Sequence, residues 1–164
     1  MDDHAARAEP PGDHERVDGS RVQVRAARTG DAAAVAGLAG ELAQSFPFSR
    51  QKFDRAYPAL VASEDACLLV AAEDGECLGY VLGFRHLTFY ANGPVGWVEE
   101  LLVRQEYRGH GLGRALMAAF ERWAAGQGCV LVALATRRAA PFYRALGYAE
   151  SAAYLRKELP SQAP

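Results

Sequence analysis

The segment 106–117, EYRGHGLGRALM, places three glycines at alternate positions directly before a stretch with helical periodicity. A glycine inside a helix costs about 1 kcal/mol relative to alanine, so this spacing needs a reason. The residues before it, 95–103, read as a strand, and residues 111–128 read as an amphipathic helix. One stripe of that helix is apolar: Leu112, Leu116, Phe120 and Trp123. The glycines are therefore predicted to lie in a turn between a strand and a helix.

An anion is the expected ligand of such a turn. The first N–H groups of a helix have no partner inside the helix and carry the positive end of its dipole. Glycines let a phosphate reach these groups, and Arg108 and Arg114 add positive charge. A P-loop does not fit because no Lys-Ser/Thr pair follows the glycines, and the dinucleotide fingerprint does not fit because Arg114 replaces its third glycine. The alternative is a glycine-rich connection that binds nothing.

Periodicity along the rest of the chain predicts alternating strands and helices. Asp-Gly at 74–75 is expected to close a hairpin, Thr29 or Asp31 to cap the first helix, and Pro58 to kink or break the second. The run 129–135 is expected to be a strand covered on both faces. The predicted strands are 21–27, 66–72, 76–90, 95–103, 129–135 and 148–159, and the predicted helices are 29–46, 49–63, 111–128 and 139–146. This order predicts an α/β protein with a mixed sheet and helices packed on it.

Composition limits the domain organisation and the partners. The chain has 164 residues and a formal net charge of −2, which fits one domain and does not suggest a nucleic-acid partner. Residues 1–20 are polar and rich in Pro and Gly, so a flexible tail is predicted before a single domain at 21–160. Cysteines and histidines lack metal-ligand spacing, and no metal is expected. The absence of a long apolar run or a signal peptide predicts a cytoplasmic protein with no membrane partner.

The turn itself, Arg108-Gly-His-Gly-Leu-Gly113, has the pattern R-x-x-G-x-G and resembles the GNAT superfamily of N-acetyltransferases. The segment 137–148, RRAAPFYRALGY, resembles a late helix of the same family, and the resemblance extends from about Arg21 to Leu159. It implies the GNAT fold, with a mixed, mostly antiparallel sheet of six to seven strands flanked by about four helices. It also implies acetyl-CoA as cofactor, a pyrophosphate held by the turn and a pantetheine arm paired with the strand backbone. Thr136 stands where many members carry an asparagine. The cofactor-binding residues implied are Leu101, Leu102, Val103, Arg108, Gly109, His110, Gly111, Leu112, Gly113, Arg114, Thr136 and Tyr143.

Acetyl transfer to an amine needs a base, a donor to the developing oxyanion and an acid for the leaving thiolate. Glu99 and Glu100 resemble the acidic pair of spermidine/spermine acetyltransferases, so we expect Glu99 to act as base, through water, and Glu100 to line the acceptor site. Adjacent strand residues face opposite sides unless a bulge intervenes, and either carboxylate could instead face solvent or pair with an arginine. Tyr143 matches the family tyrosine that protonates the thiolate. The N–H of Leu101 or Leu102 is expected to meet the carbonyl oxygen.

The acceptor is the least constrained part of this prediction. Phe46, Phe48 and Tyr90 are expected to line its site, with His86 and Phe89 as further candidates. Aromatic and acidic groups suit a cationic amine, such as a polyamine, an aminoglycoside or an amino-acid derivative, and a peptide amine stays open. The predicted function is transfer of an acetyl group from acetyl-CoA to a primary amine by direct attack. The alternative is a non-catalytic acyl-CoA sensor, which would have little reason to keep Glu99 and Tyr143. Homodimers are frequent among similar proteins, so a homodimer is a possible state.

Overall fold

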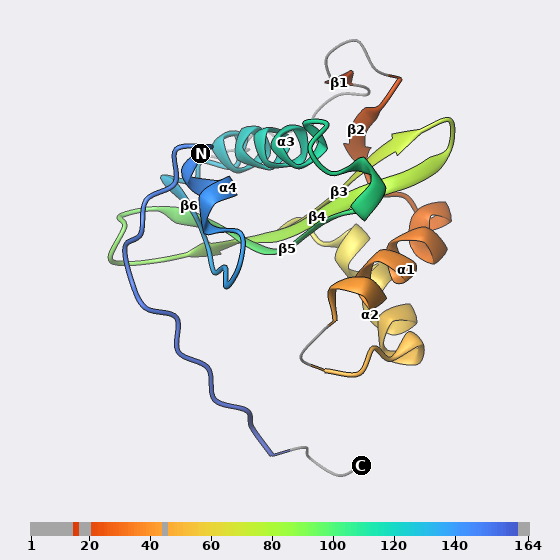
Figure 1. Ribbon diagram of the computed structural model, residues 1–164. Coiled ribbons are helices and arrows are strands. Elements are labelled where there is room, and N and C mark those ends of the chain that lie inside the picture. The colour runs from red at the N-terminus through yellow and green to blue at the C-terminus, as the bar shows by residue number, and fades with distance from the viewer. Residues whose placement is uncertain (1–14, 17–20, 44–45, 161–164) are drawn as a thin grey trace, which may run out of the picture. The chain divides into compact units, whose positions relative to one another are not determined.

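The computed structural model describes residues 15–16, 21–43 and 46–160 (Figure 1). It divides into two compact units, one up to Leu134 and one from Ala135. Most of the predicted tail lies outside the described residues, as does the end of the first predicted helix at 44–45. Two tail residues, Glu15 and Arg16, form a short strand. The single domain at 21–160 stays a prediction.

The unit up to Leu134 contains one six-stranded sheet in the order β1-β2-β3-β4-β5-β6. Every neighbouring pair is antiparallel except β5 and β6, which are parallel, so the predicted mixed and mostly antiparallel sheet is confirmed. The elements are β1 (Glu15–Arg16), β2 (Gln23–Ala26), η1 (Thr29–Asp31), α1 (Ala32–Leu42), α2 (Arg50–Ala62), β3 (Ala66–Glu73), β4 (Glu76–Leu87), β5 (Pro94–Val103), η2 (Gln105–Tyr107), α3 (Leu112–Gly126) and β6 (Leu131–Leu134), with α4 (Ala140–Arg144) in the second unit.

Helices cover both faces of this sheet. Figure 1 shows α3 on one face and α1 and α2 on the other. The α3 stripe is buried, with Phe120 fully enclosed, as its spacing predicts. On the opposite face α1 and α2 pack over a second apolar cluster: Ala27, Val35, Leu38, Tyr57, Leu68, Val70, Cys77, Tyr80, Leu82 and Leu102. The central strands are consequently buried from both sides.

Two expectations about the helices are not met in full. Pro58 does not break α2, which runs from Arg50 to Ala62, because Phe53, Tyr57 and Leu60 hold the helix against the cluster. Asp31 precedes α1 but makes no side-chain cap there. Its carboxylate instead accepts hydrogen bonds from other groups, described below.

Two expectations about the strands are also wrong. The last predicted strand does not form, and residues 149–160 are exposed and without regular structure. Its apolar run at 152–155 is followed by three charged residues, so no face is consistently apolar, and the described part of its unit contains no strand to pair with. The strand β6 is less buried than a strand covered on both faces, since Leu131 is exposed and residues 132–134 are half-buried. Among the described residues, no helix is long and apolar enough to cross a membrane.

Candidate active site

The turn between β5 and α3 has the geometry that its glycines suggest. Gly109 and Gly111 have φ angles of +80° and +85°, in the left-handed region that side chains disfavour. Gly111 directly precedes α3. A Cβ at Gly109 would meet nothing within 4 Å, so the space beside this backbone is open. Glycine is required here by conformation, and the space it leaves is available to a ligand.

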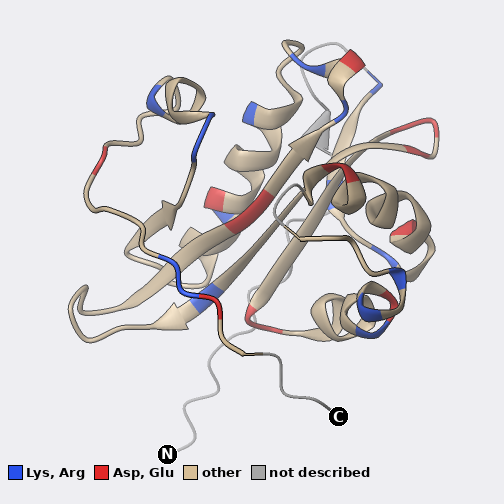
Figure 2. Ribbon diagram, turned by 60° about the horizontal axis from the view of Figure 1, so that its bottom comes forward, with Lys and Arg blue, Asp and Glu red and all other residues tan. Residues whose placement is uncertain are grey.

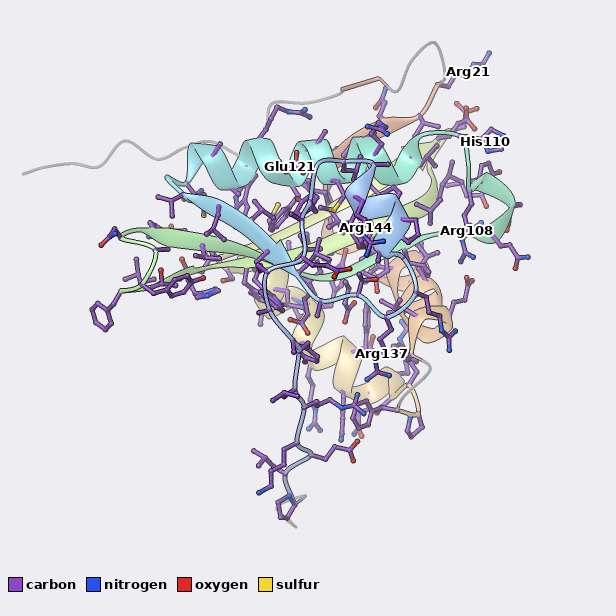
Figure 3. All side chains as sticks on the ribbon, turned by 60° about the vertical axis from the view of Figure 1, so that its left-hand side comes forward. Arg21, Arg108, His110, Glu121, Arg137 and Arg144 are labelled. Atoms are coloured by element: carbon purple, nitrogen blue, oxygen red, sulfur yellow. The ribbon has the colours of Figure 1, made fainter. Side chains whose placement is uncertain are left out.

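The N–H groups at the start of α3 point toward the N-terminal end of the helix, where the turn lies. In the turn, the N–H of Tyr107 bonds to the carbonyl of Arg104 and the N–H of Arg108 bonds to the carbonyl of Gln105. In the helix, the N–H of Ala115 bonds to the carbonyl of Gly111. No side chain from the described part of the chain caps α3. Figure 3 shows Arg108 and His110 at the N-terminal end of α3, with Glu121 farther along it. The arrangement is an uncapped helix N-terminus with positive charge beside it, which suits a phosphate.

Among the described strands, none pairs with one edge of β5 beside this turn, although the Arg108 Nε donates a hydrogen bond to the carbonyl of Val103 at 2.9 Å. Its pairing with β6 ends at Val98 opposite Leu134, but β5 continues to Val103. The N–H of Arg104 bonds to the carbonyl of Leu78 on β4. Because an antiparallel ladder alternates, residue 102 then points its N–H toward β4, while residues 101 and 103 point theirs to the open edge. Of the two predicted oxyanion donors, Leu101 is therefore the one directed away from β4.

A β-bulge in β5 determines where the acidic pair points. Gly83 of β4 pairs with Val98, but the adjacent Leu82 pairs with Glu100, so Glu99 is the extra residue. Leu82 belongs to the cluster under α1 and α2. Glu100 therefore faces the α1/α2 side, because directly paired residues share a face. Glu99 lies on that side too, two residues after Trp97, which is paired with Phe84 of the same cluster. The bulge that the acidic pair needs to share one environment is present.

Each carboxylate accepts a hydrogen bond from a neutral donor. The Tyr80 hydroxyl lies 2.6 Å from Glu100 Oε2, and the Trp97 Nε1 lies 2.9 Å from Glu99 Oε2. Glu99 is exposed and Glu100 is half-buried. Among the described residues, neither forms an ion pair with Lys or Arg. Figure 2 shows the strands as largely uncharged, with a red band across one of them. The result is negative charge on one face of the sheet, with no cationic partner from the described part of the chain.

Sequence reasoning missed Tyr80 and Trp97 as parts of this site. Both look like ordinary core aromatics in apolar strands. The signal that could have found Trp97 is its position two residues before Glu99, on the same side of a strand. The contact of Tyr80 with Glu100 depends on the pairing register across the bulge, which no local pattern in the sequence reveals.

The residue predicted to protonate the leaving thiolate, Tyr143, lies in the second unit. Tyr143 is on α4 between the rings of Phe142 and Tyr148, with centroid distances of 5.0 and 5.9 Å. Burial raises the pKa of its phenol, which therefore keeps its proton at neutral pH. In the same unit, the Thr136 hydroxyl accepts a hydrogen bond from the N–H of Ala139 at 3.1 Å, so its proton stays available for donation.

The predicted acceptor-lining residues do not form one group. Phe48 packs against Phe53 of α2 at a centroid distance of 5.8 Å and beside Gly40 of α1, and Phe46 is 54% exposed. Tyr90 lies in the β4–β5 turn and is 75% exposed, and Phe89 and His86 are exposed at the same end of the hairpin. That turn is at the opposite end of β5 from the glycines. Phe48 is therefore on the α1/α2 side with the acidic pair, whereas Tyr90 is far along the strand.

Comparisons with known proteins agree with this architecture. The model of the acetyltransferase (GNAT) family matches residues 35–148. Aminoglycoside N(6′)-acetyltransferase type 1 of Stenotrophomonas maltophilia is 34% identical over 141 residues, which are 80% of this chain and 89% of the relative.

Solved structures share the fold. A Trypanosoma brucei acetyltransferase has a TM-score of 0.73 and 25% identity, over 84% of this chain and 99% of that one. The aminoglycoside N-acetyltransferase AAC(6′)-Iy, bound to a bisubstrate analogue that contains CoA, has a TM-score of 0.72 and 21% identity, over 85% of this chain and 100% of that one. The uncapped turn, the open strand edge, the family match and the curated relative lead to one conclusion: the chain belongs to the GNAT family of acetyltransferases and transfers the acetyl group of acetyl-CoA to an amine.

Proposed function

We propose that the chain acetylates a primary amine of a small cationic molecule by direct attack on acetyl-CoA, with Glu99 as base. One observation carries this proposal: the bulge places two carboxylates on one face, beside the open edge of β5, and no described Lys or Arg pairs with them. An acceptor ammonium group would supply the missing positive charge. The sensor alternative has no supporting observation.

The cofactor is proposed to lie across the turn and the strand edge. The N–H groups of residues 109–114 would hold the diphosphate, with Arg108 and Arg114 adding charge. The outward C=O group of Leu101 and the outward N–H group of Val103 would pair with the pantetheine arm, and Thr136 would donate one further hydrogen bond. This placement brings the thioester near the bulge, because Leu101 is two residues from Glu99.

The proposed chemistry assigns one task to each group. Glu99 accepts the proton of the ammonium group through water, which leaves a neutral amine to attack the thioester carbonyl. The N–H of Leu101 donates to the oxygen as it becomes negative. The C–S bond then breaks, and Tyr143 gives its proton to the departing thiolate. A protonated phenol can do this because the reference pKa values of phenol and thiol lie within about 2 units.

The acceptor class and the setting are further parts of the proposal. The Stenotrophomonas maltophilia relative is named for an aminoglycoside amine, which supports an aminoglycoside or a similar polycationic amine here. The family match extends across both units, which supports a single catalytic domain at 21–160. Cys67, Cys77 and Cys129 are free thiols, which supports a reducing, cytoplasmic compartment. A homodimer is proposed by analogy alone.

A thiol-release assay tests this function. Acetyl-CoA is supplied with neamine, spermidine or a lysine-containing peptide, and release of CoA is followed for the wild type, Glu99→Gln and Glu41→Gln. We expect turnover with neamine or spermidine, a fall in kcat of about 10²-fold for Glu99→Gln, and no change for Glu41→Gln, an exposed residue of α1. No release with any amine would refute the function, and full activity of Glu99→Gln would refute the role of that residue.

A further inference from the structure

We propose that Tyr80 is a positioning residue for the acceptor: its hydroxyl fixes the Glu100 carboxylate as the counter-charge for an ammonium group of the acceptor. The inference rests on the proposed function, because it takes the bulge in β5 as the place where the amine binds. The residue that it adds to the site, Tyr80, lies inside the core and touches no substrate.

The position of the Tyr80 hydroxyl is the first reason. Tyr80 is 1% exposed and its ring belongs to the apolar cluster under α1 and α2. A phenylalanine would fill that space equally well, and a buried hydroxyl costs free energy unless it is hydrogen-bonded. This hydroxyl reaches Glu100 Oε2 at 2.6 Å, within the range of a hydrogen bond to a charged oxygen. The Tyr80 hydroxyl is therefore a polar group of the core that contacts a carboxylate of the site.

The direction of that hydrogen bond is the second reason. Burial raises the pKa of Tyr80, and the charge of Glu100 and the hydrogen bond to it raise the pKa further. The phenol therefore keeps its proton and donates it, and the ionised carboxylate accepts. Glu100 Oε2 is accordingly occupied by this hydrogen bond, which fixes the position of the carboxylate.

The contrast between the two carboxylates is the third reason. Glu99 is exposed, and its hydrogen bond comes from Trp97, two residues away on the same strand. Glu100 is half-buried and anchored from β4 by a side chain in the core. An exposed carboxylate is in contact with water, whereas an anchored one holds its charge in a fixed position. Since no described Lys or Arg forms an ion pair with Glu100, the fixed charge is left for an external cation.

Tyr80→Phe tests this inference, with Tyr57→Phe as a matched control. Tyr57 is 3% exposed in the same cluster, and its hydroxyl donates to the carbonyl of Arg28 at 2.8 Å, so the control loses a comparable buried hydrogen bond away from the bulge. Binding of neamine to the protein with CoA is measured by calorimetry, alongside kinetics with acetyl-CoA and thermal unfolding. We expect Tyr80→Phe to raise the Kd and the KM for neamine about tenfold, with kcat within about twofold of the wild type. Tyr57→Phe should leave both constants unchanged.

A double-mutant cycle identifies the route of the effect. If Tyr80 acts through the charge of Glu100, Glu100→Gln weakens neamine binding at least as much, and Tyr80→Phe adds nothing in that background. Equal effects of the two Tyr→Phe variants, additive effects in the cycle, or no neamine binding by the wild type would overturn the inference. If the protein transfers acetyl groups but the variants do not weaken neamine binding as expected, the proposed function stands and the inference fails. If the variants weaken neamine binding as expected but no thiol is released, the proposed function is refuted and the role of Tyr80 in binding is retained.

Discussion

At the scale of single residues, one extra residue in β5 changes which face of the sheet two of its side chains point to. In a regular strand Glu99 and Glu100 would face opposite sides of the sheet, one under α3 and one under α1 and α2. The bulge at Glu99 puts both on the α1/α2 side, where Trp97 and Tyr80 each donate a hydrogen bond to one carboxylate. The two carboxylates share one face of the sheet because of the local pairing register of β5 with β4, not because of composition.

Tyr143→Phe should separate catalysis from cofactor binding. Loss of the phenolic proton leaves the thiolate without its proposed acid, so we expect kcat to fall by about 10²-fold while the Kd for CoA changes by less than about twofold. Tyr154→Phe, which alters an exposed tyrosine in the same unit, is the control. Steady-state kinetics give kcat, and calorimetry gives the Kd for CoA. Unchanged turnover in Tyr143→Phe would remove the acid role.

Asp31 provides a residue-scale prediction about stability and pH. Its carboxylate accepts two hydrogen bonds from Arg25 at 2.7 and 2.8 Å, and the N–H of Arg28 donates a third. The hydrogen bonds from Arg25 lower the pKa of Asp31, with a smaller contribution from the N–H of Arg28. A lowered folded-state pKa stabilises the fold above the unfolded pKa of about 3.9, and this stabilisation is lost as pH falls through the folded value.

Asp31→Asn should therefore lower the free energy of unfolding at pH 7 by about 3 kcal/mol, because it leaves a largely buried Arg25 guanidinium without its charge partner. The difference from wild type should shrink as pH falls below about 4. Asp54→Asn, in an exposed pair with Arg50, should change stability by less than about 0.5 kcal/mol. Urea unfolding over a pH series measures both. A difference for Asp31→Asn that does not depend on pH would contradict the assignment.

At the scale of elements, the sheet approaches α3 closely where glycines replace side chains. A Cβ at Gly83 would lie 2.4 Å from the Phe120 ring and 2.6 Å from the carbonyl oxygen of Trp97. Gly83 is also the β4 residue next to the register shift. Close packing of β4 against β5 and α3 therefore coincides with the bulge. The same region holds the helix that presents its N-terminus to the cofactor and the strand that carries the acidic pair.

Gly83→Ala should disturb this packing, and Gly37→Ala is its control. The backbone of β5 cannot move away from a new methyl group without shifting the bulge, so we expect a loss of about 1–3 kcal/mol in unfolding free energy. Gly37 is an exposed residue of α1 with nothing within 4 Å of an added Cβ, and alanine there should stabilise the helix by about 0.5–1 kcal/mol. Urea titrations compare the two. A Gly83→Ala protein as stable as the wild type would show that the sheet can relax at this point.

At the scale of the whole molecule, local patterns predicted most of the fold. The Asp-Gly turn at 74–75 has positive φ at both residues, as a two-residue hairpin turn requires, and the α3 stripe is buried as its spacing predicts. The glycine-rich turn was found because strand, glycines and helix follow one another within one short segment.

What the sequence could not predict depends on register and on partners distant in the chain. The bulge arises from pairing between β4 and β5, so the roles of Tyr80 and Trp97 were not visible in any one strand. Residues 148–159 resemble a strand but have no ladder partner among residues 135–160 of their own unit. Pro58 suggested a break, but packing of α2 against the cluster outweighs the loss of one helical hydrogen bond.

The most direct test of the account is a crystal structure of the protein with coenzyme A. We expect the diphosphate within hydrogen-bonding distance of N–H groups of residues 109–114, and the pantetheine arm paired with Leu101 along the open edge of β5, so that the sulfur approaches the bulge at Glu99. A diphosphate bound elsewhere, or a pantetheine arm that leaves this edge unpaired, would contradict the account.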